Sequence, residues 1–349
     1  MSERLSITIK KPDDWHLHLR DGEMLKGVLP YSSLDYARAI IMPNLVKPLK
    51  RLPDIIAYQE RVLAALPVGH RFTPLMTAYL SDDTVASEIV EGYQHGILKA
   101  VKLYPAHATT NSAHGVSSIS AVLPVLESMQ KHGIALLIHG EVTDSSVDVF
   151  EREARFLDTV LLPLMKLLPE LKIVLEHVTT TEAADLIMDG PANLAATVTP
   201  QHIFLNRNAL FQGGLRPHNY CLPILKKEQH RARLMQAVTS GCQRFFLGTD
   251  SAPHEKHRKE SACGCAGAFN APVALSVYAQ VFEQANALDK LEAFTSINGP
   301  KFYQVPVNDE SITLLKKNYV VPNSIAIAGI GEVIPFLAGE TLSWSIKRE

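Results

Sequence analysis

A short stretch near the N-terminus, "WHLHLR" at 15–20, sets two histidines and an arginine at alternating positions. In an extended strand, successive side chains point to opposite faces. His16, His18 and Arg20 would then share one face, and the apolar residues at 15, 17 and 19 would share the other. The stretch indicates either histidines that hydrogen-bond to the backbone at a strand end or part of a functional cluster that the rest of the chain completes.

Other residues that could take part in binding or catalysis lie at the ends of later apolar runs of the sequence. They are Asn44, Lys102, His139, His177 and Asp250. The four histidines, Lys102 and Asp250 offer nitrogen and oxygen ligands suited to zinc or a similar divalent ion. A single buried histidine is more often a hydrogen-bonded core residue. Because four histidines fall at the ends of apolar runs, the set favours a metal site.

Lys102 is the exception in this set, because an ammonium group repels cations and cannot ligate them. Burial near positive charge lowers the pKa of a lysine, and the neutral amine can react with carbon dioxide to form an anionic carbamate. A buried ion pair between the lysine and an aspartate is the alternative. The residues alone leave both interpretations open.

Eight short, β-rich apolar runs divide the chain and indicate the elements that would position these residues. The runs are 6–19, 38–44, 72–80, 98–105, 134–142, 171–179, 194–202 and 244–252. Helical spacing of apolar residues marks the stretches 53–66, 119–133 and 149–168 between them. Alternating strands and helices favour parallel pairing, and eight units predict a closed (β/α)8 barrel of the TIM type. An open, doubly wound sheet is the alternative, but no glycine-rich phosphate-binding motif follows any run.

The barrel prediction brings the candidate residues together. In a (β/α)8 barrel, the carboxyl ends of the strands meet on one face, and the active site is built there. Residues far apart in the sequence would therefore share one pocket.

Composition narrows the class of partner. The 349 residues are 46% hydrophobic and 20% charged, as in an ordinary globular protein with a large core. A formal charge of −2 without a dense block of Lys and Arg argues against nucleic acid and favours a small-molecule substrate. Since no secretory signal and no run of 18 apolar residues is found, we expect no membrane association and a cytoplasmic location.

Four cysteines, Cys221, Cys242, Cys263 and Cys265, are too few for a disulfide scaffold in a chain of this length. Cys-x-Cys without a second cysteine pair is a weak zinc motif. We therefore expect free thiols.

Several motifs between about residue 11 and residue 303 resemble those of the amidohydrolase superfamily and, more narrowly, its short, single-domain dihydroorotases. The motifs are "DWHLHLRDG" at 14–22, "MPN" at 42–44, "KLYPAHATTNSAHG" at 102–115, "HGE" at 139–141, "EHVTT" at 176–180, "GGLRPHNYCLPILK" at 213–226, "LGTDSAPH" at 247–254 and "KESACGCAGAFNAP" at 259–272. The resemblance implies the reversible cyclisation of N-carbamoyl-L-aspartate to L-dihydroorotate and water, in pyrimidine synthesis. It also implies a homodimer of single-domain chains, with the barrel over 1–349 and a C-terminal extension at about 304–349.

The resemblance further implies a binuclear zinc site. One zinc would be held by His16, His18 and Asp250, the other by His139 and His177, and carboxylated Lys102 would bridge them together with a hydroxide. Asp250 would also be the catalytic group that accepts a proton from the hydroxide and returns it to the leaving nitrogen.

The same resemblance assigns substrate contacts. Arg20, Asn44 and His254 would bind the substrate carboxylate, for which a guanidinium offers a bidentate fork. The backbone of Leu222 and Ala266 would contact the amide edge of the ring. His18 and His139 would also touch the substrate.

The segment "PAHATTNSAHG" at 105–115 follows the Lys102 run and is rich in small and hydroxyl residues. From composition alone it is a surface loop. The resemblance implies a lid, in which Thr109 and Thr110 reach the carboxylate of the open-chain substrate. We expect the loop to be ordered over carbamoyl-aspartate and looser over dihydroorotate or an empty site.

Two other functions fit parts of the sequence. Hydantoinases and allantoinases act on other cyclic amides but usually add a β-sandwich built partly from residues ahead of the His-x-His strand. Only 15 residues precede His16, although 311–348 is β-rich. A non-catalytic scaffold with the same fold would lack ligands, and none is missing here.

Overall fold

The protein is described by a computed structural model that covers residues 5–262 and 264–348. Eight parallel strands form one sheet in which each pairs with the next along the chain. They are β2 (Asp13–Leu17), β3 (Arg38–Ile41), β4 (Thr73–Tyr79), β5 (Ala100–Leu103), β6 (Ala135–His139), β7 (Ile173–Glu176), β8 (Leu194–Val198) and β9 (Phe245–Leu247). A bridge between Leu17 and Ser251 joins β2 to the chain just after β9. The sheet is thus closed, and the predicted (β/α)8 barrel is confirmed.

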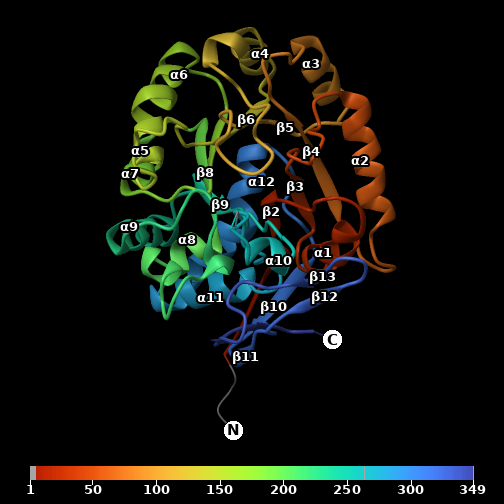
Figure 1. The fold of residues 1–349 in the computed structure, drawn as a ribbon, viewed down its shortest axis with the longest axis vertical. Helices are drawn as coiled ribbons and strands as arrows, with labels where there is room; N and C mark the ends of the chain where they lie inside the picture. Colours follow the sequence, from red (N-terminus) through yellow and green to blue (C-terminus); the bar gives the residue numbers. More distant parts are fainter. Residues whose placement is uncertain (1–4, 263, 349) are drawn as a thin grey trace.

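Helices follow the strands and pack around the barrel (Figure 1). The longer ones are α1 (Gly22–Asp35), α2 (Leu52–Ala64), α3 (Ala86–Gln94), α4 (Ile119–His132), α7 (Thr181–Asp189), α9 (Glu228–Thr239) and α11 (Ala274–Gln284), and the shorter ones are α5 (Arg152–Phe156), α6 (Leu162–Leu167), α8 (Pro200–Phe204), α10 (Lys256–Lys259) and α12 (Asn298–Tyr303). None of the helices within the described ranges is long and apolar enough to cross a membrane.

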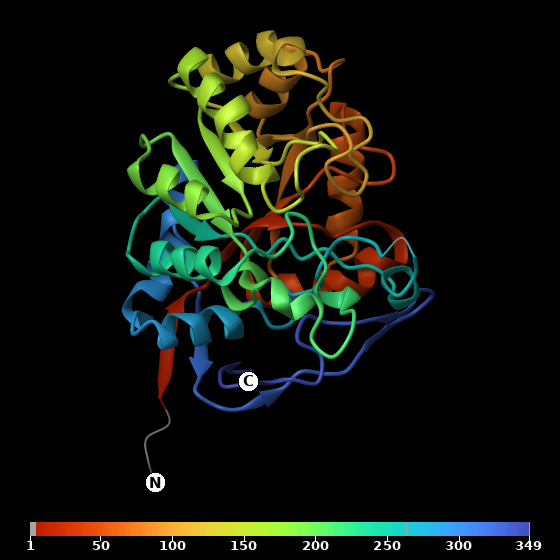
Figure 2. The same ribbon diagram turned by 60° about the vertical axis from the view of Figure 1, so that its left-hand side comes forward.

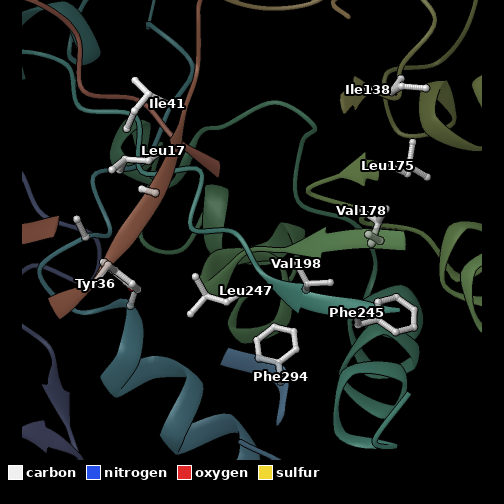
Figure 3. Close-up of a cluster of buried hydrophobic side chains, with 14 of the residues drawn as sticks. Leu17, Tyr36, Ile41, Ile138, Leu175, Val178, Val198, Phe245, Leu247 and Phe294 are labelled. Carbon is white, nitrogen blue, oxygen red and sulfur yellow. The ribbon is translucent and has the colours of Figure 1, made fainter. Parts of the chain in front are cut away.

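Alternation along the strands separates two apolar clusters. One, which includes Trp15, Leu137 and Phe246, fills the barrel interior. The other lies between the outer face of the strands and the helices, and Figure 3 shows part of it, with Val198 and Leu247 among the labelled side chains. Each large aliphatic side chain buried in these layers contributes roughly 1.5–3 kcal/mol. The barrel is therefore a rigid frame for whatever its strand ends carry.

The first apolar run, 6–19, was expected to be one strand, and this expectation is wrong. The structure divides it into β1 (Ser6–Lys10) and β2, which belong to different sheets. Pro12 lies between them, and a proline has no amide hydrogen to donate to a sheet. β1 instead pairs antiparallel with β10 (Ser311–Leu315).

Strict alternation in "WHLHLR" is also wrong. Trp15 lies in the interior cluster and stacks on Tyr303, whereas Leu17 and Leu19 lie in the outer cluster. The pairing of β2 with β3 shifts register between Asp14 and Leu17. A bulge of this kind places an extra residue on one strand, which breaks the period of two.

The stretch 149–168, predicted as one helix, is interrupted. α5 and α6 are separated by a π-helical turn at Leu157–Leu161. Pro163 lies in the first turn of α6 and cannot donate the hydrogen bond that a continuous α-helix requires.

The C-terminal segment after α12 is made of short strands. They are β10, β11 (Tyr319–Val320), β12 (Ile325–Ile327), β13 (Gly331–Val333), β14 (Thr341–Leu342) and β15 (Ser345–Ile346). β10 lies between β1 and β15, so the two ends of the chain share one small sheet, and they lie at the same end of the molecule (Figures 1 and 2). The division into one barrel domain and an extension at about 304–349 stays a prediction.

Cys221, Cys242 and Cys265 are free thiols, as expected. Cys263 lies outside the described residues. No cysteine belongs to a candidate metal group in the part of the chain that the structure describes.

Candidate active site

The two histidines of β2 and the aspartate after β9 converge at the barrel mouth. Nε2 of His16 and Nε2 of His18 lie 3.3 and 3.1 Å from Oδ1 of Asp250, and the two nitrogens lie 3.2 Å apart. All three residues are buried. Burial lowers the pKa of His18 to about 4, so its imidazole is neutral at neutral pH, which is the form that binds metals.

His139, at the end of β6, and His177, just after β7, form the second half of the cluster. Their ring centroids lie 4.7 Å apart, and the His177 ring lies 5.1 Å from that of His16. His16, Glu176 and His177 make a second group whose ligand atoms lie within 4.8 Å of one another. Nδ1 of His177 is buried without a hydrogen-bond partner. A buried, unpartnered imidazole nitrogen beside a carboxylate has the chemistry of a metal ligand, so these residues fit a metal centre.

Lys102 lies on β5 and points into the barrel, where it forms an ion pair with Glu176. Both side chains are fully buried. Oε2 of Glu176 also lies 3.0 Å from Nδ1 of His16. Burial lowers the pKa of Lys102, and the charge of Glu176 only partly offsets this. The lysine is thus paired with a glutamate, not the aspartate that the sequence suggested as an alternative to carboxylation.

Asp14 ties the ligand-bearing strands together. Its carboxylate accepts hydrogen bonds from the amide of His16 at 3.1 Å and from the amide and hydroxyl of Thr249 at 2.8 and 2.5 Å. The amide of Asp250 in turn donates to the carbonyl of His16 at 2.9 Å. These bonds hold the ends of β2 and β9 in register.

The backbone is strained where the ligands sit. Arg20, His177 and Asp250 have φ values of 59, 42 and 47°. Positive φ in a residue other than glycine costs on the order of 1–3 kcal/mol and persists only where the surroundings enforce it. At His177 they include Thr197, whose hydroxyl accepts from the His177 amide at 2.9 Å.

Burial alone would raise the pKa of Asp250, but its interactions with His16 and His18 outweigh this and lower it to about 2.

A small cavity lies over the cluster. It is lined by His16, His18, Arg20, Asn44, Tyr104, Thr109, Thr110, His139, His177, Leu222, Asp250, Ala252, Ala266 and Gly267. Its volume is about 20 Å³, which is room for about one water molecule. The structure thus brings almost all the predicted metal and substrate residues to one space, and that space is too small for a substrate while the surrounding loops hold this position.

Arg20 and His254 lie side by side at the cavity. Nη2 of Arg20 is 2.9 Å from Nε2 of His254, and Nε donates to the carbonyl of Pro253 at 3.0 Å. Among the described residues, no carboxylate lies within 4.0 Å of the Arg20 guanidinium. Burial lowers the pKa of this guanidinium. His254 is nearly buried, and burial together with Arg20 lowers its pKa to about 2. A half-buried guanidinium without an acidic partner can bind an anionic ligand.

The 105–115 loop folds over the same cavity and is fastened to β3 and β4. Nδ2 of Asn44 donates to the carbonyl of Thr110 at 3.0 Å, and Nδ2 of Asn111 donates to the carbonyl of Asn44 at 3.0 Å. The hydroxyl of Tyr79 donates to the carbonyl of Asn111 at 3.3 Å. Asn44 therefore contacts the 105–115 loop, which its sequence position after Pro43 did not reveal.

Sequence reasoning missed three inward-facing residues. Glu176 pairs with Lys102, Glu141 lies 2.8 Å from Nε2 of His139, and Tyr104 places its ring 4.9 Å from Nζ of Lys102. A signal for Glu176 was present, because it lies two residues after the interior Val174 in an otherwise apolar strand.

Comparison with known proteins agrees with this geometry. Residues 13–314 match the Amidohydrolase family. The dihydroorotase of Yersinia pestis (strain Pestoides F) is 59% identical over 343 residues, 98% of each chain. The crystal structure of dihydroorotase from Saccharomyces cerevisiae in complex with 5-fluoroorotic acid superposes with a TM-score of 0.90 at 36% identity over 98% of each chain. An L-hydantoinase from Arthrobacter aurescens shares the fold, with a TM-score of 0.82, but only 15% identity over 98% of this chain and 83% of its own. The chain belongs to the amidohydrolase family and, within it, to the dihydroorotases.

Proposed function

We propose that the chain catalyses the zinc-dependent, reversible cyclisation of N-carbamoyl-L-aspartate to L-dihydroorotate and water, in the de novo synthesis of UMP. As a dihydroorotase, it is a hydrolase of cyclic amide C–N bonds. The observation that carries the proposal is the convergence of four histidines, Lys102 and Asp250 at the mouth of a barrel whose full-length relatives are dihydroorotases.

Two zinc ions are the proposed cofactor. His16, His18 and Asp250 would hold one and His139 and His177 the other, with carboxylated Lys102 and a hydroxide shared between them. When bound, the ions supply the Lewis acidity that lowers the pKa of water and polarises an amide carbonyl. The unpartnered Nδ1 of His177 and the neutral imidazole of His18 support this assignment.

Carboxylation of Lys102 is supported by its surroundings. A fully buried amine with a lowered pKa is a nucleophile towards carbon dioxide. The product is an anion, so it would be repelled by Glu176 unless cations lie between or beside the two groups. Carboxylation and metal loading should therefore occur together.

The remaining residues act on the substrate. Asp250 would accept a proton from the attacking water on its carboxylate and return it to the leaving ring nitrogen. Arg20, Asn44 and His254 would bind the substrate carboxylate, and the backbone of Leu222 and Ala266 would hold the amide edge of the ring. All of these residues except His254 line the one small cavity, and Nε2 of His254 lies 2.9 Å from Nη2 of Arg20.

We also propose a cytoplasmic location and a homodimer. Both rest on the resemblance and the composition alone.

A substrate panel tests the function. Purified protein with its zinc content measured should interconvert carbamoyl-aspartate and dihydroorotate, with little turnover of hydantoin, dihydropyrimidine or allantoin. A higher kcat/KM on hydantoin or allantoin than on dihydroorotate would overturn the assignment and favour the hydantoinase alternative.

A further inference from the structure

A buried lysine outside the metal cluster holds the loops that form one wall of the cavity. Lys259 is the last residue of α10 and is only 2% exposed. Its Nζ donates to three backbone carbonyls, those of Tyr220 at 2.8 Å, Cys265 at 2.9 Å and Gly267 at 2.6 Å. A lysine ammonium has three donors, so this arrangement uses all of them.

These carbonyls flank the two backbone positions that the proposed function assigns to the substrate ring. Cys265 and Gly267 lie on either side of Ala266, and Tyr220 lies two residues before Leu222. Both Leu222 and Ala266 line the cavity. Within the described ranges, neither the amide of Ala266 nor the backbone of Leu222 has a hydrogen-bond partner. The wall therefore offers free polar backbone groups within two residues of three carbonyls that bind one ammonium.

Other contacts anchor each segment to its own surroundings; on one side, Sγ of Cys221 lies 3.6 Å from Nε2 of His202. The 265–268 segment is attached to the strand end by the amide of Ala252, which donates to the carbonyl of Ala268 at 2.9 Å. The 220–222 segment joins 265–267 through Lys259 and through one bond from the amide of Gly267 to the carbonyl of Tyr220, at 3.0 Å. His254 cannot replace the lysine, because a neutral Nε2 either accepts from Arg20 or donates to the Ala266 carbonyl, but not both.

The lysine is costly to keep there. No carboxylate pairs with it among the described residues, and burial lowers its pKa to about 8. Burying a charge without an opposite charge is unfavourable unless hydrogen bonds compensate. The three carbonyls supply this compensation, and an apolar residue would leave them without a donor, so the position favours a role that needs the three donors.

We propose that Lys259 is a positioning residue that fixes the spacing between the 220–222 and 265–267 backbone segments, so that their free groups match the amide edge of the substrate ring. The inference rests on the proposed function and deepens it. A misplacement of about 1 Å in a binding group can cost on the order of a hundredfold in efficiency. Because the metal ligands lie on other elements, loss of the lysine weakens ring binding without emptying the metal site.

The test compares Lys259→Met, which keeps the length of the side chain, with Lys256→Met. Lys256 lies on the same short helix but is exposed and pairs with Glu332 at 3.2 Å. Zinc content, kcat and KM for dihydroorotate, and the calorimetric Kd for 5-fluoroorotic acid are measured for each. The acid carries the ring amide edge and reports binding without turnover.

We expect Lys259→Met to keep its zinc, to raise KM and the Kd for 5-fluoroorotic acid together by about tenfold or more, and to change kcat by less than about threefold. Lys256→Met should match the unaltered protein. Unchanged KM and Kd, or a fall in kcat and melting temperature alone, would show a merely structural role and overturn the inference. If Lys259→Met does not fold, Lys259→Gln, which keeps an N–H donor, is judged by the same criteria. Absence of dihydroorotate turnover in the unaltered protein is a different result, and it would refute the proposed function.

Discussion

The candidate metal ligands and the candidate substrate contacts line one cavity but are held by different parts of the fold. His16 and Lys102 lie within barrel strands, His139 is the last residue of its strand, and the other ligands lie just beyond strand ends. Arg20, Thr110 and Ala266 lie on loops that reach over those ends. Pairing between neighbouring strands fixes the positions of the metal ligands. The positions of the substrate contacts depend on loop conformation. Chemistry is thus assigned to the rigid frame, and recognition to the parts that can move.

The two groups also differ in how their polar atoms are satisfied. His16 lies 3.0–3.3 Å from Glu176 and Asp250, His18 lies 3.1 Å from Asp250, and Nδ1 of His177 is left for the proposed metal to complete. On the loop side, Arg20 has no acidic partner within the described residues, and the backbone of Leu222 is free. Substitutions in the first group should therefore remove metal and chemistry together, while those in the second should mainly change binding.

The largest effect is expected from Asp250→Ala. It removes a metal ligand and the proposed proton acceptor at once, and loss of proton transfer alone lowers rates by about 10²–10⁴-fold. Turnover should become undetectable in a coupled assay, and zinc content should fall. Asp289→Ala, at an exposed aspartate paired with Lys290, is the matched control and should behave as the unaltered protein. Retention of more than a tenth of the activity by Asp250→Ala would refute its assigned role.

Lys102→Ala should come next. It removes the proposed bridging ligand and leaves the buried carboxylate of Glu176 without its partner. Metal analysis should give about two zinc ions per unaltered chain and no more than one in the variant, with most activity lost. Lys99→Ala is the control, because Lys99 lies one residue before β5 and its Nζ donates to the carbonyl of Tyr303, at 3.0 Å, away from the metal ligands.

The carbamate itself can be observed in the unaltered protein. Labelling with ¹³C-bicarbonate should give a carbamate signal that disappears in Lys102→Ala. Two zinc ions per chain with no such signal would leave the metal site intact but contradict the bridge.

The contrast between frame and loops also explains what the sequence could predict. Eight apolar runs were enough for the barrel, and the barrel was enough to bring His16, His139 and Asp250 together, because strand ends converge whatever the details of each strand. The bulge at Asp14–Leu17 was not predictable. It depends on how β2 pairs with β3, which is a contact between two segments and not a property of either.

Loop contacts were harder still. The assignments of Leu222, Ala266 and His254 came from resemblance. For Leu222 and Ala266 the backbone makes the contact, and every residue type has the same backbone groups. The bonds from Lys259 to three carbonyls were invisible for the same reason. Glu176 was predictable, because it lies two residues after the interior Val174 and therefore points to the same side of its strand.

Arg20→Met tests the loop side. A charge-assisted hydrogen-bonding group contributes about 1.5–3 kcal/mol, which corresponds to roughly 10- to 150-fold in binding. KM for both substrates should rise within this range, and zinc content should stay the same. Arg61→Met is the control, since Arg61 is exposed and pairs with Asp21 at 2.8 Å. Normal binding by Arg20→Met would show that the substrate carboxylate is held elsewhere.

The smallest effect is expected from substitutions in the proposed lid. They should also separate most clearly the effects on turnover from the effects on metal content. Replacing Thr109 with Ala and Thr110 with Val removes two hydroxyls from the cavity wall without touching a metal ligand. Closure of a loop excludes water and strengthens electrostatic interactions in the site, so turnover should fall by about tenfold while zinc content stays the same. His114→Ala, at an exposed position of the same loop, is the control.

The conformational part of the lid prediction needs ligands. Since a cavity of about 20 Å³ cannot hold a substrate, one of its walls must move for entry, and movement of the 105–115 loop would break its bonds to Asn44. Crystals with carbamoyl-aspartate should show the loop ordered over the site, and crystals with dihydroorotate should show it displaced or weaker in density. An identical loop in both crystals, or an unchanged rate in the double variant, would make the 105–115 segment a spacer and leave the cavity to open by another wall, of which the 220–222 segment is the next candidate.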